Sequence, residues 1–132
     1  MTVCAISPIS TRQAEKNRPN ILCVDDSQEI LEICQKMLEA VGYQVFTAKT
    51  GEGALRLLHA HAMDAAVIDC MMPGMQGPDL AREIKSAASN VLVVMFSGVL
   101  HGDEAFPCVD ACLPKGKGPL ALRKLLDSLL QM

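Results

Sequence analysis

Short apolar runs alternate with segments of helical periodicity along the chain, and this alternation limits the possible folds more than any other feature. The runs lie at residues 21–24, 43–48, 65–68, 91–96 and 109–113. Continuous apolar runs of this length are typical of strands buried on both faces, and the less apolar run at 43–48 is expected nearer a sheet edge. Strands that alternate with helices favour a parallel sheet covered by helices, so the sequence predicts an α/β domain.

Helical periodicity is clear in residues 27–41, 53–61, 79–88 and 120–130. In the first of these segments one stripe is predicted to form the buried face, and it consists of Ile30, Ile33, Cys34, Met37, Leu38 and Val41. Residues 99–107, between the last two strands, have poor helical periodicity. We therefore expect the fourth helix of the alternation to be short or irregular.

Length and composition indicate one globular domain preceded by an extension. The chain has 132 residues, of which 50% are apolar and 20% are charged, so it can build a core. Residues 1–19 are rich in polar side chains and contain Pro8 and Pro19. We expect this N-terminal extension to be disordered and residues 20–132 to form the domain.

The charge and the aromatic content argue against nucleic-acid and membrane partners. Twelve basic residues face fifteen acidic ones, and the chain has one Tyr, three Phe and no Trp. It also contains no apolar run of the roughly 18–20 residues that a membrane-spanning helix needs. Six cysteines without a visible signal peptide suggest reduced thiols, so we expect a cytoplasmic protein.

Polar residues stand at the carboxyl ends of four predicted strands. Asp25 and Asp26 follow the first strand, Asp69 the third and Ser97 the fourth, and Lys115 follows the fifth. In open α/β sheets the functional site lies beyond the carboxyl ends of the strands. Three carboxylates, a hydroxyl and an ammonium group are therefore expected to converge on one edge of the sheet.

Such a cluster favours a divalent cation and phosphoryl chemistry. Two carboxylates about 5 Å apart repel each other by roughly 3 kcal/mol at an effective dielectric constant of 20. Oxygen ligands with open coordination positions suit Mg²⁺, which leaves room for phosphoryl oxygens that Lys115 and Ser97 can also bind. Asp69 stands alone between the Asp pair and Ser97, so it is the best candidate for a nucleophile that becomes an acyl phosphate.

Each of these residues also has an ordinary structural explanation. Paired aspartates after a strand often cap a helix, a strand-end Ser such as Ser97 often pairs with backbone, and a single Lys such as Lys115 is usually a solvated surface charge. The combination at four separate strand ends is what favours a functional interpretation.

Four segments of the sequence resemble the receiver domain of two-component response regulators. They are Ile21-Leu22-Cys23-Val24-Asp25-Asp26, Val67 to Gly77 with its Asp-x-x-Met-Pro-x-Met-x-Gly pattern, Phe96-Ser97-Gly98 and Leu113-Pro114-Lys115. The resemblance covers the chain from about Asn20 to Met132. It implies a flavodoxin-like, three-layer fold whose five-stranded parallel sheet has the order 2-1-3-4-5, with helices on both faces.

The resemblance also implies roles for the strand-end residues. Asp69 would accept a phosphoryl group from a phosphohistidine of a sensor histidine kinase or a histidine phosphotransfer protein. Asp26, Asp69 and the backbone carbonyl of Met71 would bind Mg²⁺, and Asp25 would hold a metal-bound water or orient the site. Ser97 and Lys115 would bind the phosphoryl oxygens.

The same resemblance implies a signalling role rather than that of a turnover enzyme. Gly98 would leave room for the phosphoryl group, and the protein would promote only its own phosphorylation and slow dephosphorylation. We expect no DNA-binding or catalytic domain after the last helix. Output would then proceed by contact with a downstream protein or by phosphoryl relay.

Two departures from the family pattern and two further positions bear on this role. Cys112 stands where the family usually has a switch Tyr or Phe, and Gly116 replaces the usual Pro after Lys115, so a trans bond is expected there. Met71 and Val99 occupy positions that influence phosphoryl lifetime in the family. Both are apolar and cannot orient an attacking water, so we expect slow self-hydrolysis.

Two other functions remain open from the sequence. The first is a phosphorylation-independent, protein-binding module that keeps the fold but has a degraded switch. The second is a small phosphohydrolase with an aspartyl nucleophile, which would normally need a second Asp where Met71 stands. Replacing Asp69 with Asn would separate a competent receiver from a constitutive module.

Overall fold

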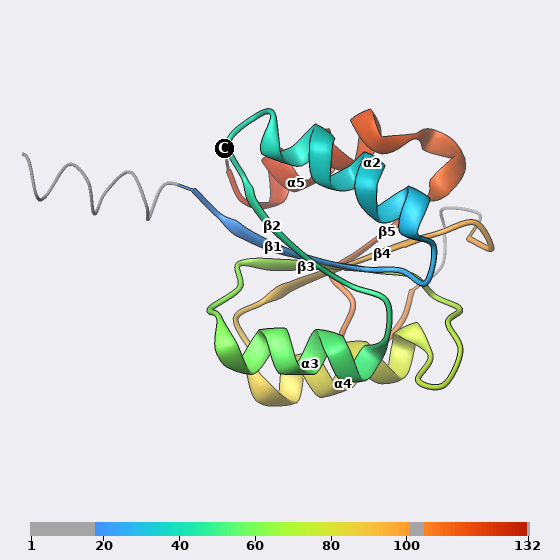
Figure 1. Ribbon diagram of the computed structural model, residues 1–132. Coiled ribbons are helices and arrows are strands. Elements are labelled where there is room, and N and C mark those ends of the chain that lie inside the picture. The colour runs from blue at the N-terminus through green and yellow to red at the C-terminus, as the bar shows by residue number, and fades with distance from the viewer. Residues whose placement is uncertain (1–17, 101–104, 132) are drawn as a thin grey trace, which may run out of the picture.

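A five-stranded parallel sheet forms the centre of the computed structural model, which describes residues 18–100 and 105–131 (Figure 1). Its strands are β1 (Asn20–Val24), β2 (Gln44–Ala48), β3 (Ala65–Ile68), β4 (Leu92–Ser97) and β5 (Ala111–Pro114). Their order in the sheet is β2-β1-β3-β4-β5, and every neighbouring pair is parallel. Both the α/β class and the predicted strand order are confirmed.

Helices cover both faces of this sheet, which gives the molecule three layers (Figure 1). They are α2 (Gln28–Glu39), α3 (Gly51–Ala60), α4 (Gly77–Ala87) and α5 (Pro119–Leu129). In Figure 1, α2 and α5 lie above the sheet, and α3 and α4 lie below it. A single 3₁₀ turn, η1 (Lys115–Lys117), joins β5 to α5.

Two apolar cores lie between these layers, one on each face of the sheet. Alternate residues of β1 supply both cores, since Leu22 faces α3 and α4 whereas Ile21 faces α2 and α5. All four residues of β3 are buried. Burying a side chain such as Leu or Ile stabilises a fold by about 1.5–3 kcal/mol. The central strands are therefore well anchored, and so are the positions of the residues that directly follow them.

The predicted buried stripe of the first helix is partly wrong. In α2 the buried residues are Leu31, Cys34 and Leu38, whereas Ile33 and Val41 are 45% and 46% exposed. The helix contacts the sheet through a row at i, i+3 and i+7, and this row is turned by about one residue from the predicted one. Ile33 and Val41 therefore lie at the outer margin of the contact.

The connection between β4 and β5 has an irregular course. Its described parts, residues 98–100 and 105–110, contain no helix, in agreement with the expected irregular fourth helix. Residues 101–104 lie outside the described part of the chain, and so does the predicted N-terminal extension up to residue 17. Among the residues that the structure describes, no helix has the length and apolar character needed to span a membrane.

Candidate functional site

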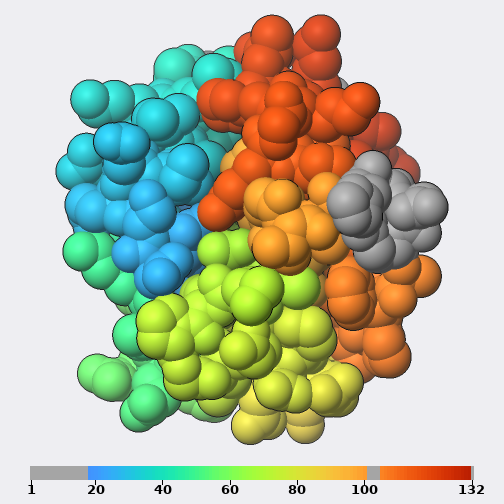
Figure 2. Space-filling view, turned by 90° about the vertical axis from the view of Figure 1, so that its right-hand side faces the viewer, coloured from blue at the N-terminus to red at the C-terminus, as the bar shows by residue number. Residues whose placement is uncertain are grey.

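The register of the sheet brings the carboxyl ends of four strands to one edge. Val24 of β1 pairs with Ile68 of β3, Ile68 pairs with Met95 of β4, and Ser97 of β4 pairs with Pro114 of β5. The residues that follow these strands are therefore neighbours, as predicted from the sequence. Figure 2 shows this edge of the molecule, where the blue, yellow-green, orange and red-orange segments meet.

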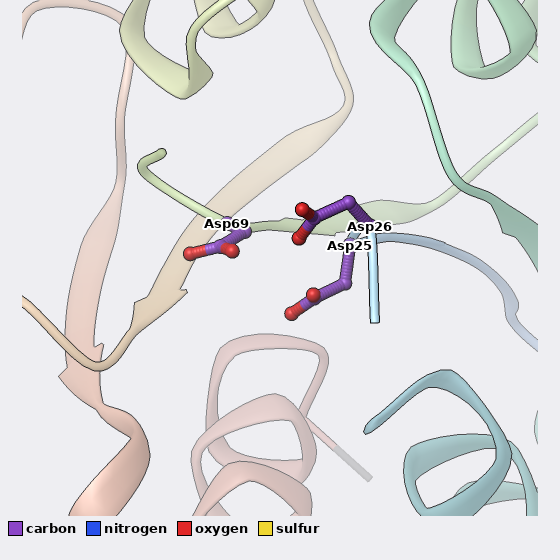
Figure 3. A group of neighbouring side chains, drawn as sticks. All are labelled: Asp25, Asp26 and Asp69. Carbon is purple, nitrogen blue, oxygen red and sulfur yellow. The ribbon is translucent and has the colours of Figure 1, made fainter. Parts of the chain in front are cut away.

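Three carboxylates gather at this edge. Asp25, Asp26 and Asp69 each offer an oxygen, and these oxygens lie within 4.8 Å of one another. Figure 3 shows the three side chains extending from the ends of β1 and β3 toward the same side. Asp25 and Asp69 are only 3% and 7% exposed, whereas Asp26 is exposed. The group is thus a largely buried pair with one carboxylate open to solvent.

Backbone hydrogen bonds hold the carboxylate-bearing residues in place. The amide of Asp25 donates to the carbonyl of Ala48 at 3.1 Å, and the amide of Asp69 donates to the carbonyl of Val24 at 3.0 Å. Asp25 Oδ1 accepts a hydrogen bond from the amide of Ser27 at 2.9 Å. The Ser27 side chain in turn caps the N-terminus of α2. Asp25 therefore also supports the turn into the helix.

Lys115 reaches the carboxylates from the end of β5. Its Nζ lies 2.6 Å from Asp25 Oδ2 and 3.4 Å from Asp69 Oδ2, and its side chain is 22% exposed. It is therefore not the freely solvated surface charge that a single Lys usually is. It bridges the two buried carboxylates and offsets part of their repulsion.

The pKa values of the bridged pair reflect this burial. Burial raises the pKa of Asp25 above its ordinary value, and hydrogen bonds from Lys115 and from the amide of Ser27 offset part of the increase. Burial alone would lower the pKa of Lys115, but the hydrogen bond and charge of Asp25, together with Asp69, raise it overall. Lys115 is consequently held in its charged form.

The loop between β3 and α4 approaches the strand end very closely. The amide of Gly77 donates to the carbonyl of Cys70 at 2.9 Å. A Cβ at residue 77 would lie 2.3 Å from the carbonyl oxygen of Asp69, which is shorter than any allowed contact. Only glycine fits at this position, and its absence of a side chain lets the loop close beside Asp69.

The remaining predicted site residues surround this cluster. Ser97 is buried at the end of β4, and a Cβ at Gly98 would meet no atom within 4 Å. Met71 and Val99 are 57% and 51% exposed. Cys112, at the expected switch position, is partly buried and packs against the core under α3 and α4.

The structure agrees with one detailed prediction and adds one contact that was not predicted. The bond between Lys115 and Gly116 is trans, as expected. The ion pair between Lys85 and Asp110, which lies at the amino end of β5, was not predicted from the sequence. The two residues are 25 positions apart and belong to no motif, so no sequence signal joins them.

The carboxylate cluster fits a small divalent cation. All three candidate side-chain ligands are oxygens, which Mg²⁺ prefers, and they lie within 4.8 Å of one another. The donor set therefore suits Mg²⁺, and Asp25, Asp26 and Asp69 are the side chains that could hold it.

Comparison with known proteins decides the family. The model of the response regulator receiver domain matches residues 21–111, which is more than half of the chain. The chain belongs to the receiver domain family. The predicted family is therefore confirmed.

Curated relatives include much longer proteins. The virulence sensor protein BvgS of Bordetella bronchiseptica is 35% identical over 138 residues, which cover 93% of this chain but only 11% of BvgS. The response regulator SaeR of Staphylococcus aureus is 42% identical over 66 residues, which cover 50% of this chain and 28% of SaeR. The matched residues thus span about a tenth of BvgS and less than a third of SaeR.

Solved receiver structures match over nearly their whole length. The response regulator TrrA of Thermotoga maritima, in complex with Mg²⁺ and BeF, has a TM-score of 0.77 at 27% identity and covers 84% of this chain and 98% of its own. TrrA in complex with the histidine kinase ThkA has a TM-score of 0.78 at 27% identity, with 85% and 98% covered.

Proposed function

We propose that this receiver domain accepts a phosphoryl group on Asp69 with the help of Mg²⁺. The observation that carries the proposal is the bridge from Lys115 to Asp69 and Asp25 beside an exposed third carboxylate. Mg²⁺ would be held by Asp26 and Asp69 with the backbone carbonyl of Met71 and with Asp25 nearby. When bound, the ion neutralises charge on the transferred phosphoryl group.

The chain's own residues would position and stabilise the transfer. An oxygen of Asp69 attacks phosphorus, the N–P bond of a phosphohistidine donor breaks, and the imidazole leaves and takes up a proton. Lys115 is already charged and lies 3.4 Å from Asp69, so it can bind a phosphoryl oxygen without a large movement. Ser97 ends the neighbouring strand and can donate to a second oxygen, and the open space at Gly98 admits the group.

We further propose the partners and the place of this reaction. The donor would be a sensor histidine kinase or a histidine phosphotransfer protein, and the TrrA–ThkA complex shows such a pairing for a similar receiver. Output would occur through contact with a downstream protein or through relay, in the cytoplasm. The protein would not act as a turnover enzyme on other substrates.

Acetyl phosphate and intact-mass measurement test the proposal directly. With Mg²⁺, we expect the purified protein to gain one phosphoryl group, and we expect no gain in the Asp69→Asn variant or after chelation of the metal. Asp79→Asn is the matched control, because Asp79 is an exposed carboxylate on α4. A gain in Asp69→Asn equal to that of the wild type would refute Asp69 as the acceptor.

A partner assay separates the receiver from a constitutive binding module. A constitutive module would bind a downstream protein equally well as the wild type and as the Asp69→Asn variant, whether or not acetyl phosphate or a phosphorylated kinase modifies it. A competent receiver would lose phosphorylation-dependent binding in that variant. The degraded switch position at Cys112 makes this comparison informative even when phosphorylation succeeds.

A further inference from the structure

The strand that directly precedes Lys115, β5, is short and lies at the edge of the sheet. β5 is four residues long, lies at the edge of the sheet and pairs only with β4. All four of its residues are partly exposed, and Pro114 at its end has no N–H to donate. Besides its pairing with β4 and the packing of Cys112 and Leu113 against the two cores, the position of β5 along β4 is therefore open to the influence of contacts outside the strand.

That position decides whether Lys115 reaches the acidic cluster. A slip of two residues would move Lys115 by about 6.6 Å, because a strand rises about 3.3 Å per residue. Its Nζ now lies 2.6 Å from Asp25 and 3.4 Å from Asp69, so even a much smaller shift would separate the groups. The described parts of the preceding connection, residues 98–100 and 105–110, contain no helix that could fix the strand.

Asp110, the residue before β5, makes contacts that do fix it. Its amide donates to the carbonyl of Val93 at 2.8 Å, and its Oδ2 accepts from the amide of Val93 at 2.8 Å. Lys85 Nζ lies 2.9 Å from the same Oδ2 and donates to the carbonyl of Val91 at 2.6 Å. One carboxylate thus joins the start of β5 to β4 and to the last turn of α4.

These contacts are shielded from solvent in a way that ordinary surface ion pairs are not. The side chains of Lys85 and Asp110 are 20% and 34% exposed, whereas those of Arg82 and Asp79, which form a pair on the same helix as Lys85, are 54% and 56% exposed. Burial opposes ionisation of Asp110, but the amide of Val93 and the charge of Lys85 lower its pKa overall. Without this carboxylate, the amide of a fully buried Val93 would lose its partner.

We propose that Asp110, clamped by Lys85, is a positioning residue that fixes the register of β5 and so holds Lys115 beside Asp25 and Asp69. Neither Asp110 nor Lys85 touches the reacting groups, since they lie at the opposite end of the strand. This inference rests on the proposed function, because it assigns to Lys115 its part in phosphoryl uptake.

A mutant cycle tests the coupling between Asp110 and Lys115. The rate of phosphorylation by acetyl phosphate with Mg²⁺ is measured for the wild type, Asp110→Ala, Lys115→Met and the double variant, at a temperature where circular dichroism shows each to be folded. We expect Asp110→Ala to slow the wild-type reaction about tenfold to a hundredfold, as a displacement of about 1 Å can do. In the Lys115→Met background the same change should alter the residual rate less than about twofold.

Matched variants separate positioning from general destabilisation. Asp110→Asn keeps an oxygen that can accept from Val93, so we expect it to restore most of the rate lost in Asp110→Ala. Asp79→Ala breaks the exposed pair on the same helix and should leave the rate unchanged. Equal slowing by Asp110→Ala in the wild-type and Lys115→Met backgrounds would overturn the proposal, because the loss would not pass through Lys115.

Failure of the proposed function would give a different result. If the wild type gained no phosphoryl group, the ¹³C signal of the Lys115 ε-methylene group would serve as the readout of position. In Asp110→Ala this Lys115 signal should move toward the signals of exposed lysines, and in Asp110→Asn it should keep its wild-type position. An unmoved signal in Asp110→Ala would overturn the proposal. If Asp110→Ala did not fold, Lys85→Met would replace it in both measurements, with the same outcomes.

Discussion

Replacing Gly77 with Ala tests whether the loop after Asp69 is as tightly closed as its backbone indicates. The added Cβ would lie 2.3 Å from the carbonyl oxygen of Asp69 and 2.8 Å from the Cα of Cys70. Both are backbone atoms, so no side chain can rotate away. A carbon atom normally lies about 3.3 Å or more from a carbonyl oxygen, so the backbone must separate by about 1 Å.

The expected cost follows from these contacts. Overpacking a tight site destabilises a protein by about 1–3 kcal/mol, and losing the hydrogen bond from Gly77 to Cys70 adds about 1 kcal/mol. Replacing glycine also restricts the unfolded chain, which returns about 0.4–1 kcal/mol. We expect a net loss of about 2–3 kcal/mol in the free energy of unfolding, or roughly 10 °C in Tm.

Urea denaturation at neutral pH measures this loss, and Gly116→Ala is the matched control. A Cβ at Gly116 meets no atom within 4 Å, and its φ is not positive, so we expect this variant to match or exceed the wild type. Gly77→Ala should also take up phosphate from acetyl phosphate more slowly while still folded, because Asp69 is displaced. Equal midpoints for Gly77→Ala and Gly116→Ala would refute the argument from close approach.

Four further predictions follow from single features of the molecule. Cys108 has a left-handed φ of 66°, which costs a non-glycine residue about 1–2 kcal/mol, so Cys108→Gly should raise the urea midpoint and an unchanged midpoint would contradict this. Mg²⁺ at 100 times its Kd should stabilise the fold by about 2.7 kcal/mol in thermal melts, and Asp26→Asn should lose most of that gain. Because the pKa of Asp110 is lowered in the folded state, its carboxylate stabilises the fold above the ordinary pKa of about 3.9, and this stabilisation disappears as the pH falls through the lower folded pKa. Circular dichroism should therefore show that Asp110→Asn loses less stability than the wild type on acidification. The phosphorylated protein should lose its phosphoryl group slowly, and Met71→Gln, which can orient a water, should shorten the half-life about tenfold by intact mass; a half-life of seconds in the wild type would contradict the expected role of apolar Met71 and Val99.

The convergence of the polar residues at the strand ends could be predicted from the sequence, because the parallel direction of the strands fixes where each strand ends. In a parallel sheet every strand runs the same way, so residues that end apolar runs must meet at one edge. Asp25, Asp69 and Lys115 could therefore be placed together from the order of the sequence alone. The structure adds that Lys115 lies closer to Asp25 than to Asp69, a preference of less than 1 Å that no pattern of residues encodes.

Features that depend on packing between distant elements could not be predicted. The buried row of α2 passes through Leu31 rather than Ile33, because the sheet and α5 set the rotation of the helix, and apolar residues occur on both sides of the row. The contact between Lys85 and Asp110 depends on how the last turn of α4 meets the start of β5. Charged residues at such spacings are common on surfaces, so their pattern carries no signal.

The charges at the acidic edge connect the site to the proposed role of β5. Asp25, Asp26 and Asp69 are three acidic side chains, Lys115 offsets one of their charges, and a bound divalent cation would balance the remaining two. With a divalent cation bound, the proposed phosphoryl group on Asp69 would replace one negative charge by roughly two, so the balanced site would gain an excess of about one. Lys115 is the chain's own cation at this point, and it directly follows β5, a four-residue edge strand that pairs with β4. A movement of Lys115 toward a phosphoryl group would draw the end of β5 with it, while Asp110 holds the start of the strand. We therefore expect phosphorylation to change the structure first in β5.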